Sequence, residues 1–331
     1  AFQSANLYLS NLMATKPSED GSDNYATLVQ AMEKSMAKTV DAPQLMASQL
    51  LLVSRLAQRA EEDTRDDLRT SEIPQVLVQE ILVENPAYTS VESGQLTDIV
   101  LESVKNIAAV KVVTKKALDP KTGSELPPEK KEADNFSQQL LKNNGQALDK
   151  IVRIIDPATL ENNQAYNPET IEKAMEALTE VSKSYDGVGK VLIEKGAVDV
   201  AAAYLVAQQP KNAEVSDIIV DPVAMHAIDH TANFLSAVVE HPDGFAKIKE
   251  VGVLPQFFAV LKAIEINEDF GKNQNDTKAV AQKEAFEAIL QFTQAISDTP
   301  HDKSIMLDAD APAILLGVLK TINEIPPEKL V

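Results

Sequence analysis

The sequence predicts an all-α fold, and three observations lead to this expectation. Apolar residues recur at positions i, i+3, i+4 and i+7 in many stretches, which is the period of an amphipathic helix. Runs in which apolar β-branched residues alternate with polar ones, the pattern of a half-buried strand, are almost absent. The 331 residues also include only 11 glycines. Helix is therefore expected along nearly the whole chain.

Composition limits the kinds of partner. Hydrophobic residues make up 44% of the chain, which is enough to bury a substantial core. The 50 Asp and Glu residues against 31 Lys and Arg give a formal charge of −19, and a field of this sign repels phosphate backbones and anionic lipid surfaces. Neither nucleic acid nor a membrane is therefore expected as a partner, and no apolar run approaches the roughly 20 residues of a membrane span.

Two further features bear on the compartment. The sequence contains no cysteine, which excludes disulfides, thiolate metal ligands and cysteine nucleophiles. Its first residues lack the basic region and long apolar core of a secretory signal. A cytoplasmic location is the default expectation.

A sharp break between two apolar helices recurs along the chain. In FAKIKEVGVLPQFFAVLKAI, residues 245–264, a short helix ends near Gly252 and a second one begins near Pro255. Glycine can take the left-handed φ that ends a helix, and proline fits the first turn of the next. Similar breaks fall at Gly145, Gly196 and Asp310, so that successive breaks are 51, 56 and 58 residues apart. The chain is expected to turn a corner at each of them.

A fifth break and a set of long helices complete the repeated unit. Ser71 stands where Gly252 would be, because Ile73-Pro74-Gln75 matches Leu254-Pro255-Gln256. Long amphipathic helices precede four of the breaks, with first residues at Ala42, Pro168, Pro222 and Lys278. The expected unit is a long helix, a short helix, a sharp turn and a second long helix.

This unit resembles the armadillo repeat. The resemblance rests on Gly252-Val-Leu-Pro255 with the apolar residues 257–261, on the equivalent breaks, and on His230-Thr-Ala-Asn233, which is similar to the family's Ala-rich third helix with its Asn. It covers about residues 25–322 and implies a right-handed α-solenoid of about five armadillo-like repeats. The spacings exceed the usual repeat of about 40–47 residues, because inserts follow several second helices, and HEAT-like helix pairs remain an alternative.

Three segments are expected along this solenoid. Residues 1–110 hold the N-terminal helices and first repeats, and residues 135–331 hold the C-terminal repeats. Between them, residues 111–134 are rich in Lys and Pro without a period, as in an exposed loop or tether. The last apolar helix, ILLGVLKTINE, is followed by no third helix, so this end is expected to pack on another chain or to continue.

The resemblance implies a non-catalytic scaffold or adaptor that binds other proteins, as extended peptide segments or as subunits of a larger assembly. Cytoskeletal or ciliary assemblies are one setting that it implies. The alternative is a transport or chaperone-type receptor for an extended basic peptide in the concave groove. Armadillo nuclear-import receptors hold such peptides with an Asn ladder and Trp, whereas Ala177 and Gln291 stand at the places equivalent to Asn233 and the chain has no Trp.

The partner is expected to bind on exposed residues of the long third helices. Arg55 and Arg59, one turn apart, can hold a carboxylate or pair with the acidic residues at 61–67. Acidic residues of the other helices can attract a basic segment, or simply form the solvated sides of these helices. The full candidate set is Arg55, Arg59, Glu172, Glu176, His226, Asp229, His230, Asn233, Glu287 and Gln291.

A metal enzyme is the rival interpretation. His226 and His230 stand one turn apart and can bind zinc with Asp229 or His241 as a third ligand, but Ala227 occupies the position of the Glu in helical metalloproteases. The sequence contains no G-x-S-x-G elbow and no glycine-rich phosphate loop. The oxygen-rich segments 119–125 and 267–276 lack EF-hand spacing. No catalytic residue, metal or cofactor is therefore predicted.

Overall fold

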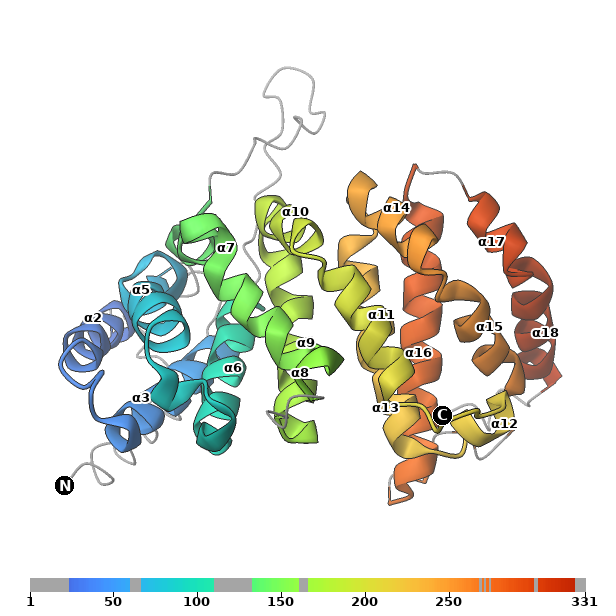
Figure 1. Ribbon diagram of the computed structural model, residues 1–331, viewed down its shortest axis with the longest axis horizontal. Helices are drawn as coiled ribbons and strands as arrows, with labels where there is room; N and C mark the ends of the chain where they lie inside the picture. The colour runs from blue at the N-terminus through green and yellow to red at the C-terminus, as the bar shows by residue number, and fades with distance from the viewer. Residues whose placement is uncertain are drawn as a thin grey trace. The chain divides into compact units, whose positions relative to one another are not determined.

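The computed structural model describes residues 24–59, 67–109, 133–160, 166–267, 270, 272–273, 275–300 and 303–324. Every regular element in these ranges is helical (Figure 1), which confirms the all-α prediction. No helix in these ranges combines the length and the apolar character needed to cross a membrane. Most of the expected tether, residues 111–134, lies outside the described residues, and the three-segment division stays a prediction.

The described residues fall into two compact units, and the first takes its residues from Ala1–Ile151 and Tyr166–Val191. Its long helices α3, α6 and α9 pack side by side, α3 on α6 and α6 on α9. Its elements are α2 (Asn24–Met36), α3 (Pro43–Arg59), α5 (Ile73–Gln75) continued by a π-helix (Val76–Val83), two short 3-10 turns (Pro86–Tyr88 and Val91–Ser93), α6 (Gln95–Ala108), most of α7 (Asn135–Ile155), α9 (Pro168–Ser184) and the start of α10 (Asp186–Glu194).

The second unit takes its residues from Val152–Ala165 and Leu192–Val331. Helix α13 packs along α16, and α15 contacts α16 and α18. Phe257 of α15 meets Phe292 of α16 edge to face, with ring centroids 5.8 Å apart. The helices of this unit are α8 (Pro157–Leu160), α11 (Ala197–Ala207), α12 (Val215–Ile218), α13 (Pro222–Val238), α14 (Pro242–Val251), α15 (Leu254–Ala263), α16 (Thr277–Asp298), α17 (Ser304–Asp308) and α18 (Ala311–Glu324).

Four of the five predicted corners are made by a residue in the left-handed region. The φ angles are 70° at Gly145, 77° at Gly196, 67° at Gly252 and 55° at Asp310. Gly252 ends α14 by donating its N–H to the carbonyl of Ile248 at 3.3 Å, and α15 begins two residues later. The corner at Gly145 interrupts α7, where Asn143 and Asn144 are also left-handed.

The fifth corner, at Ser71, uses a side chain instead. The Ser71 hydroxyl donates to the carbonyl of Leu68 at 2.9 Å and accepts the N–H of Ile73 at 3.2 Å. Glu72 keeps a right-handed conformation, with φ −84° and ψ −9°. The hydroxyl therefore satisfies the backbone on both sides of the turn without a left-handed residue.

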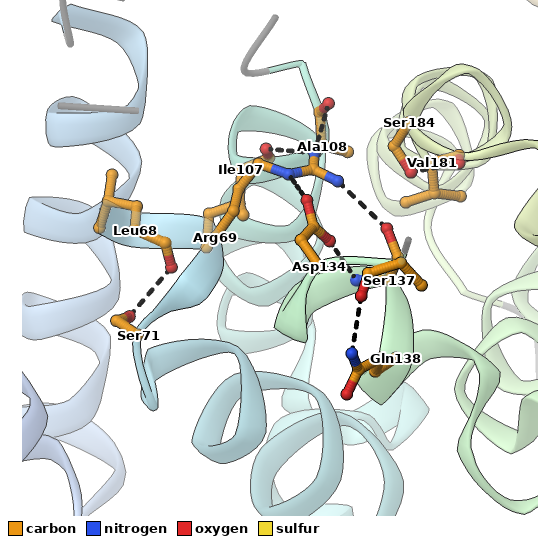
Figure 2. A network of polar contacts seen from close by, with 11 residues as sticks. Leu68, Arg69, Ser71, Ile107, Ala108, Asp134, Ser137, Gln138, Val181 and Ser184 are labelled. Carbon is orange, nitrogen blue, oxygen red and sulfur yellow. Dashed lines mark hydrogen bonds and ion pairs between the residues drawn. The ribbon is translucent and has the colours of Figure 1, made fainter. Parts of the chain in front are cut away.

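A buried arginine joins two helix ends within unit 1, the end of α6 and the start of α7 (Figure 2). Arg69 is 1% exposed. Its guanidinium donates to the carbonyls of Ile107 and Ala108, at 3.3 and 3.2 Å, where α6 ends. It also pairs with the carboxylate of Asp134 and donates to the hydroxyl of Ser137 at 3.2 Å, where α7 begins. One side chain thus holds both ends of the segment between α6 and α7.

The charges in this cluster complement the helix ends. The last carbonyls of α6 carry partial negative charge, which suits the guanidinium, and Asp134 accepts the N–H of Ser137 at 2.8 Å in the first turn of α7. Burial opposes ionisation of Asp134, but its hydrogen bonds with Arg69 and Ser137 outweigh burial and lower its pKa below the ordinary 3.8. The stabilisation from this carboxylate is therefore present above pH 3.8 and is lost as the pH falls through the lowered pKa.

The corner at Gly252 gives the first testable expectation. A Cβ added there meets no atom within 4 Å, so any cost of a side chain comes from the left-handed backbone alone. We expect Gly252→Ala to lower the free energy of unfolding by about 1–2 kcal/mol, measured by urea denaturation. Gly252→Asn, which tolerates this conformation better, serves as the matched control and should cost less; equal losses for Ala and Asn would contradict the explanation.

The contacts of Arg69 give a second testable expectation. We expect Arg69→Met to destabilise the protein by about 3–5 kcal/mol, because it removes the buried guanidinium that pairs with the half-buried carboxylate of Asp134 and donates to the last carbonyls of α6. The exposed Arg55→Met should cost no more than about 1 kcal/mol. When the free energy of unfolding is measured as the pH is lowered, Asp134→Asn should remove part of the decrease in stability that the unaltered protein shows below pH 3.8. An unchanged acid profile would refute the assignment.

Candidate partner-binding surface

The candidate residues lie on four third helices, two in each unit. Arg55 and Arg59 on α3, with Glu172 and Glu176 on α9, belong to unit 1. Arg55 is exposed and Glu172 is half-buried, while the Arg59 side chain lies outside the described residues. The other six belong to unit 2, with His226, Asp229, His230 and Asn233 on α13 and Glu287 and Gln291 on α16.

In unit 1, Glu176 is paired across the contact between α9 and α6. Its carboxylate accepts a hydrogen bond from the Lys105 ammonium of α6 at 2.9 Å, and the same ammonium lies 3.0 Å from Glu102. Burial of Lys105 opposes protonation, but its bonds to Glu176 and Glu102 outweigh that effect and raise the pKa above the ordinary 10.5. Glu176 is therefore neutralised locally by a residue that is absent from the predicted set.

Further polar bonds tie the three long helices of unit 1 together. Asn106 of α6 donates to the hydroxyl of Ser54 on α3 and, at 3.1 Å, to Glu102. Thr170 of α9 donates to Asp98 of α6. Ser54, Asp98, Asn106 and Thr170 are all buried. These groups serve helix packing and are not available to a ligand.

In unit 2, four candidates meet on one side of α13. Asn233 donates to Asp229 at 2.9 Å, and Nδ1 of His230 lies 3.7 Å from the other Asp229 oxygen. The rings of His226 and His230 are stacked with centroids 6.5 Å apart. Nδ1 of His226 lies 3.5 Å from Glu284 of the neighbouring helix α16.

The part of α16 beside this cluster is more open. Glu287 and Gln291 are exposed, and Glu287 lies 3.8 Å from Lys283 one turn earlier. The packing of α13 along α16 places both helices in one continuous face of unit 2. We call His226, Asp229, Glu284, Glu287 and Gln291 the α13–α16 face.

Comparison with solved structures gives the fold. A designed armadillo repeat protein in complex with the peptide (KR)4 is 15% identical, has a TM-score of 0.55, and is matched over 89% of this chain and 93% of that chain. The fold is that of an armadillo-repeat solenoid. Two engineered proteins are also similar. One is 14% identical, has a TM-score of 0.53, and is matched over 87% of this chain and 89% of that chain. The other is 13% identical, has a TM-score of 0.50, and is matched over 87% of this chain and 91% of that chain. No protein-family model and no curated protein matches the sequence.

The armadillo architecture explains what sequence reasoning missed. Helices α14, α15 and α16 form a three-helix repeat rather than a HEAT-like pair. Helix α6 is a third helix in the same sense as α13: Asn106 and Asn233 each stand 11 residues after the first residue of their helix. Both amides donate to an acid one turn earlier, Glu102 and Asp229. An acidic residue four positions before an Asn, as in Glu102 with Asn106 and Asp229 with Asn233, was the signal in the sequence that could have identified α6.

The contacts of Asn106, His226 and His230 bear on the two alternatives predicted from the sequence, a receptor for basic peptides and a metal enzyme. Asn106 is 7% exposed, and its amide nitrogen already donates to Ser54 and Glu102, so it has no free donor for a peptide. Within the described ranges, no group of three or more His, Cys, Asp or Glu side chains is placed to hold a metal ion. His226 instead faces Glu284, and His230 lies beside Asp229.

The ion pair between α6 and α9 gives a testable expectation. Because Lys105 and Glu176 remain partly exposed, their coupling should be modest. In a double-mutant cycle with Lys105→Met and Glu176→Gln, we expect an interaction free energy of about 0.5–1 kcal/mol at neutral pH. It should disappear above pH 10.5, as the raised pKa of Lys105 is passed and the ammonium loses its proton. A coupling that persists in that range would show that packing, not charge, links the two residues.

Proposed function

We propose that this chain is a non-catalytic scaffold or adaptor that binds other proteins through the third helices of its armadillo-like repeats. The observation that carries the proposal is the α13–α16 face. The apolar sides of both helices are buried, while their polar sides gather on one surface. Glu284 and Glu287 are 46% and 55% exposed there, so a partner can reach charged groups held in fixed positions by rigid helices.

The partner in this proposal is an extended segment or a subunit of a larger assembly. A repeat stack offers a long surface, which suits such partners better than a small molecule. The proposal assigns no reaction to the protein: His226 and Glu284 lie close to each other, and Asp229 and Glu287 lie beside Asn233 and Lys283 of their own helices. We place the protein in the cytoplasm, with a cytoskeletal or ciliary assembly as one setting.

One observation favours a second candidate, a receptor for basic peptides. Asp229, Glu284 and Glu287 make the face acidic, in a chain of net charge −19. A structural neighbour is in complex with the peptide (KR)4, which supports trying such a ligand here. Opposed to it, Asn106 is engaged within unit 1, and the chain has no Trp.

A charge-reversal experiment tests both candidates. The probe is the peptide (KR)4, and its binding to purified protein is followed by fluorescence anisotropy at several salt concentrations. For a basic-peptide receptor, the double variant Glu284→Lys/Glu287→Lys should weaken binding by about tenfold or more, which is about 1.4 kcal/mol, and salt should weaken it further. Glu240→Lys, at an exposed acid just beyond α13, makes the same kind of change away from the face and should have little effect.

The scaffold proposal is tested with the same variants and the natural partners. Proteins captured by the unaltered chain are cross-linked and mapped, and their recovery is compared between the two variants. We expect cross-links on α13 and α16 and a loss of recovery with the double variant alone. Peptide binding that ignores both salt and the double variant would eliminate the basic-peptide receptor. Partners that cross-link elsewhere and survive the double variant would eliminate this face as the binding surface.

A further inference from the structure

A polar pocket of unit 1 is lined by no residue of the long third helices. Its volume is about 510 Å³, within the range of roughly 300–1,000 Å³ that is usual for ligand pockets. Its walls come from the turn between α2 and α3, from α5 and the π-helix, from the residues directly after the π-helix, and from Lys142 of α7. All of these segments belong to unit 1, so the pocket is formed within one compact body.

Negative charge prevails in this pocket. Its charged lining residues are Asp41, Glu80 and Glu84 against Lys142. Within the part of the chain that the structure describes, none of these three carboxylates forms an ion pair or accepts a side-chain hydrogen bond. A cationic ligand is therefore attracted to the pocket, where it meets carboxylates that no other side chain neutralises.

Gln79 is a second sign of a ligand, independent of the charges. It lines the pocket and is only 5% exposed. Its amide nitrogen donates to the carbonyl of Gln139 at 2.6 Å, and because a carbonyl can only accept, this bond fixes the orientation of the amide. The amide oxygen makes no hydrogen bond with any described residue. A buried acceptor without a donor is unfavourable, and a group bound in the pocket can supply that donor.

The π-helix brings Gln79 and Glu84 to the same pocket. The N–H of Glu84 donates to the carbonyl of Gln79, five residues back, at 3.0 Å. In an α-helix of 3.6 residues per turn, side chains five positions apart point about 140° away from each other. A turn that closes after five residues places one nearly above the other instead. π-helical turns are rare and occur frequently at functional sites, which agrees with a binding role for this one.

Local structure fixes two edges of the pocket. On one side, the hydroxyl of the buried Tyr88 donates to the carbonyl of Val40 at 2.7 Å, which holds the turn that carries Asp41. Burial, and then the nearby charge of Asp41, raise the pKa of Tyr88 to about 12, so the phenol keeps its proton and this bond at neutral pH. On the other side, Lys142 directly precedes the left-handed residues of the α7 corner.

The arrangement favours an organic cation over a metal ion. In the ranges that the structure describes, no three acidic or His side chains are placed to hold a metal ion, so the carboxylates of the pocket do not converge on one small ion. A guanidinium has five N–H donors in a planar fork, whereas a lysine ammonium is a compact point charge. The fork can donate to the oxygen of Gln79 and to a carboxylate at the same time.

We propose that the pocket lined by Asp41, Gln79, Glu80, Glu84 and Lys142, which we call the π-helix pocket, binds a guanidinium group. The group is carried by an arginine of a partner protein or by a free guanidino compound. It donates to the amide oxygen of Gln79 and is neutralised by the carboxylates, while Lys142 opposes binding by repulsion of like charge. The site lies in unit 1 and does not depend on the α13–α16 face, which belongs to unit 2.

The test uses small probes and the purified chain. N-acetyl-arginine methylamide is titrated into the nitrogen-labelled protein, and NMR follows the amide signals of residues 75–85. We expect saturable shifts there, with a Kd on the order of 1 mM. The matched control, N-acetyl-citrulline methylamide, has a similar shape without the charge and should give no saturable shifts. N-acetyl-lysine methylamide should bind about threefold more weakly than the arginine probe.

Charge variants locate the binding. Glu80→Gln and Glu84→Gln should each weaken it by about threefold, because each removes one carboxylate from the pocket. Glu92→Gln, at an exposed acid of unit 1 that does not line the pocket, is the matched control and should have no effect. Lys142→Met should strengthen binding by about threefold, a gain that a purely structural role of Lys142 would not produce.

A longer probe identifies the source of the guanidinium. If the capped peptide Ala-Ala-Arg-Ala-Ala binds at least tenfold more tightly than the single residue, the natural ligand is an arginine of a partner protein. Equal affinity assigns the pocket to a free guanidino compound. The double variant Glu284→Lys/Glu287→Lys should leave both affinities unchanged, so that failure of this site and failure of the proposed function are distinguishable.

Any of four results would overturn the proposal. They are no saturable shifts with the arginine probe, equal binding of the citrulline probe, tighter binding of the lysine probe, and binding that Lys142→Met weakens rather than strengthens.

Discussion

Each repeat of this chain depends on one backbone constraint, the turn that stops a short first helix and directs the second. At Gly145, Gly196, Gly252 and Asp310 the constraint is a positive φ. An L side chain is strained in this region, and short polar residues tolerate it best after glycine. A positive φ starts the second helix in the required direction at these four corners, and at Ser71 the hydroxyl bonds to the backbone on both sides of the turn do the same. Their apolar sides then lie where neighbouring helices can cover them, so the packing of a layer follows from its corner.

The corners and caps were predictable because their signals are local. A left-handed residue, a proline in the first turn and an N-cap such as Asn167 or Asp221 act within a few residues, and the structure places helix starts beside each. Helix α6 escaped because it lacks those signals: it starts after Gly94 with no proline and no side-chain cap. Its apolar period was visible, but about 25 residues of insert separate it from the next described helix.

The contacts between helices were not predictable in the same way. The bond from Asn233 to Asp229 follows from helix geometry, since residues four apart share a face. The pairing of His226 with Glu284 and of Lys105 with Glu176 depends on how far one helix is shifted along another. Arg69 is the extreme case, because its partners lie 38 to 68 residues away in the sequence. A single sequence contains no signal for such a shift or for such a distance.

A solenoid is stabilised because neighbouring layers cover one another, and this also determines which of its surfaces stay open to a partner. Each layer is covered by the next, so burying a leucine at a layer contact contributes about 1.5–3 kcal/mol. At α18, Leu316 and Leu319 do not receive that contribution within the described chain. Leu205 of α11 and Leu261 of α15, by comparison, are fully or almost fully buried. The α13–α16 face differs, because Glu284 and Glu287 are exposed there, so a partner on this face meets charge as well as water. Recognition of charge in this way favours specificity and salt dependence over apolar burial.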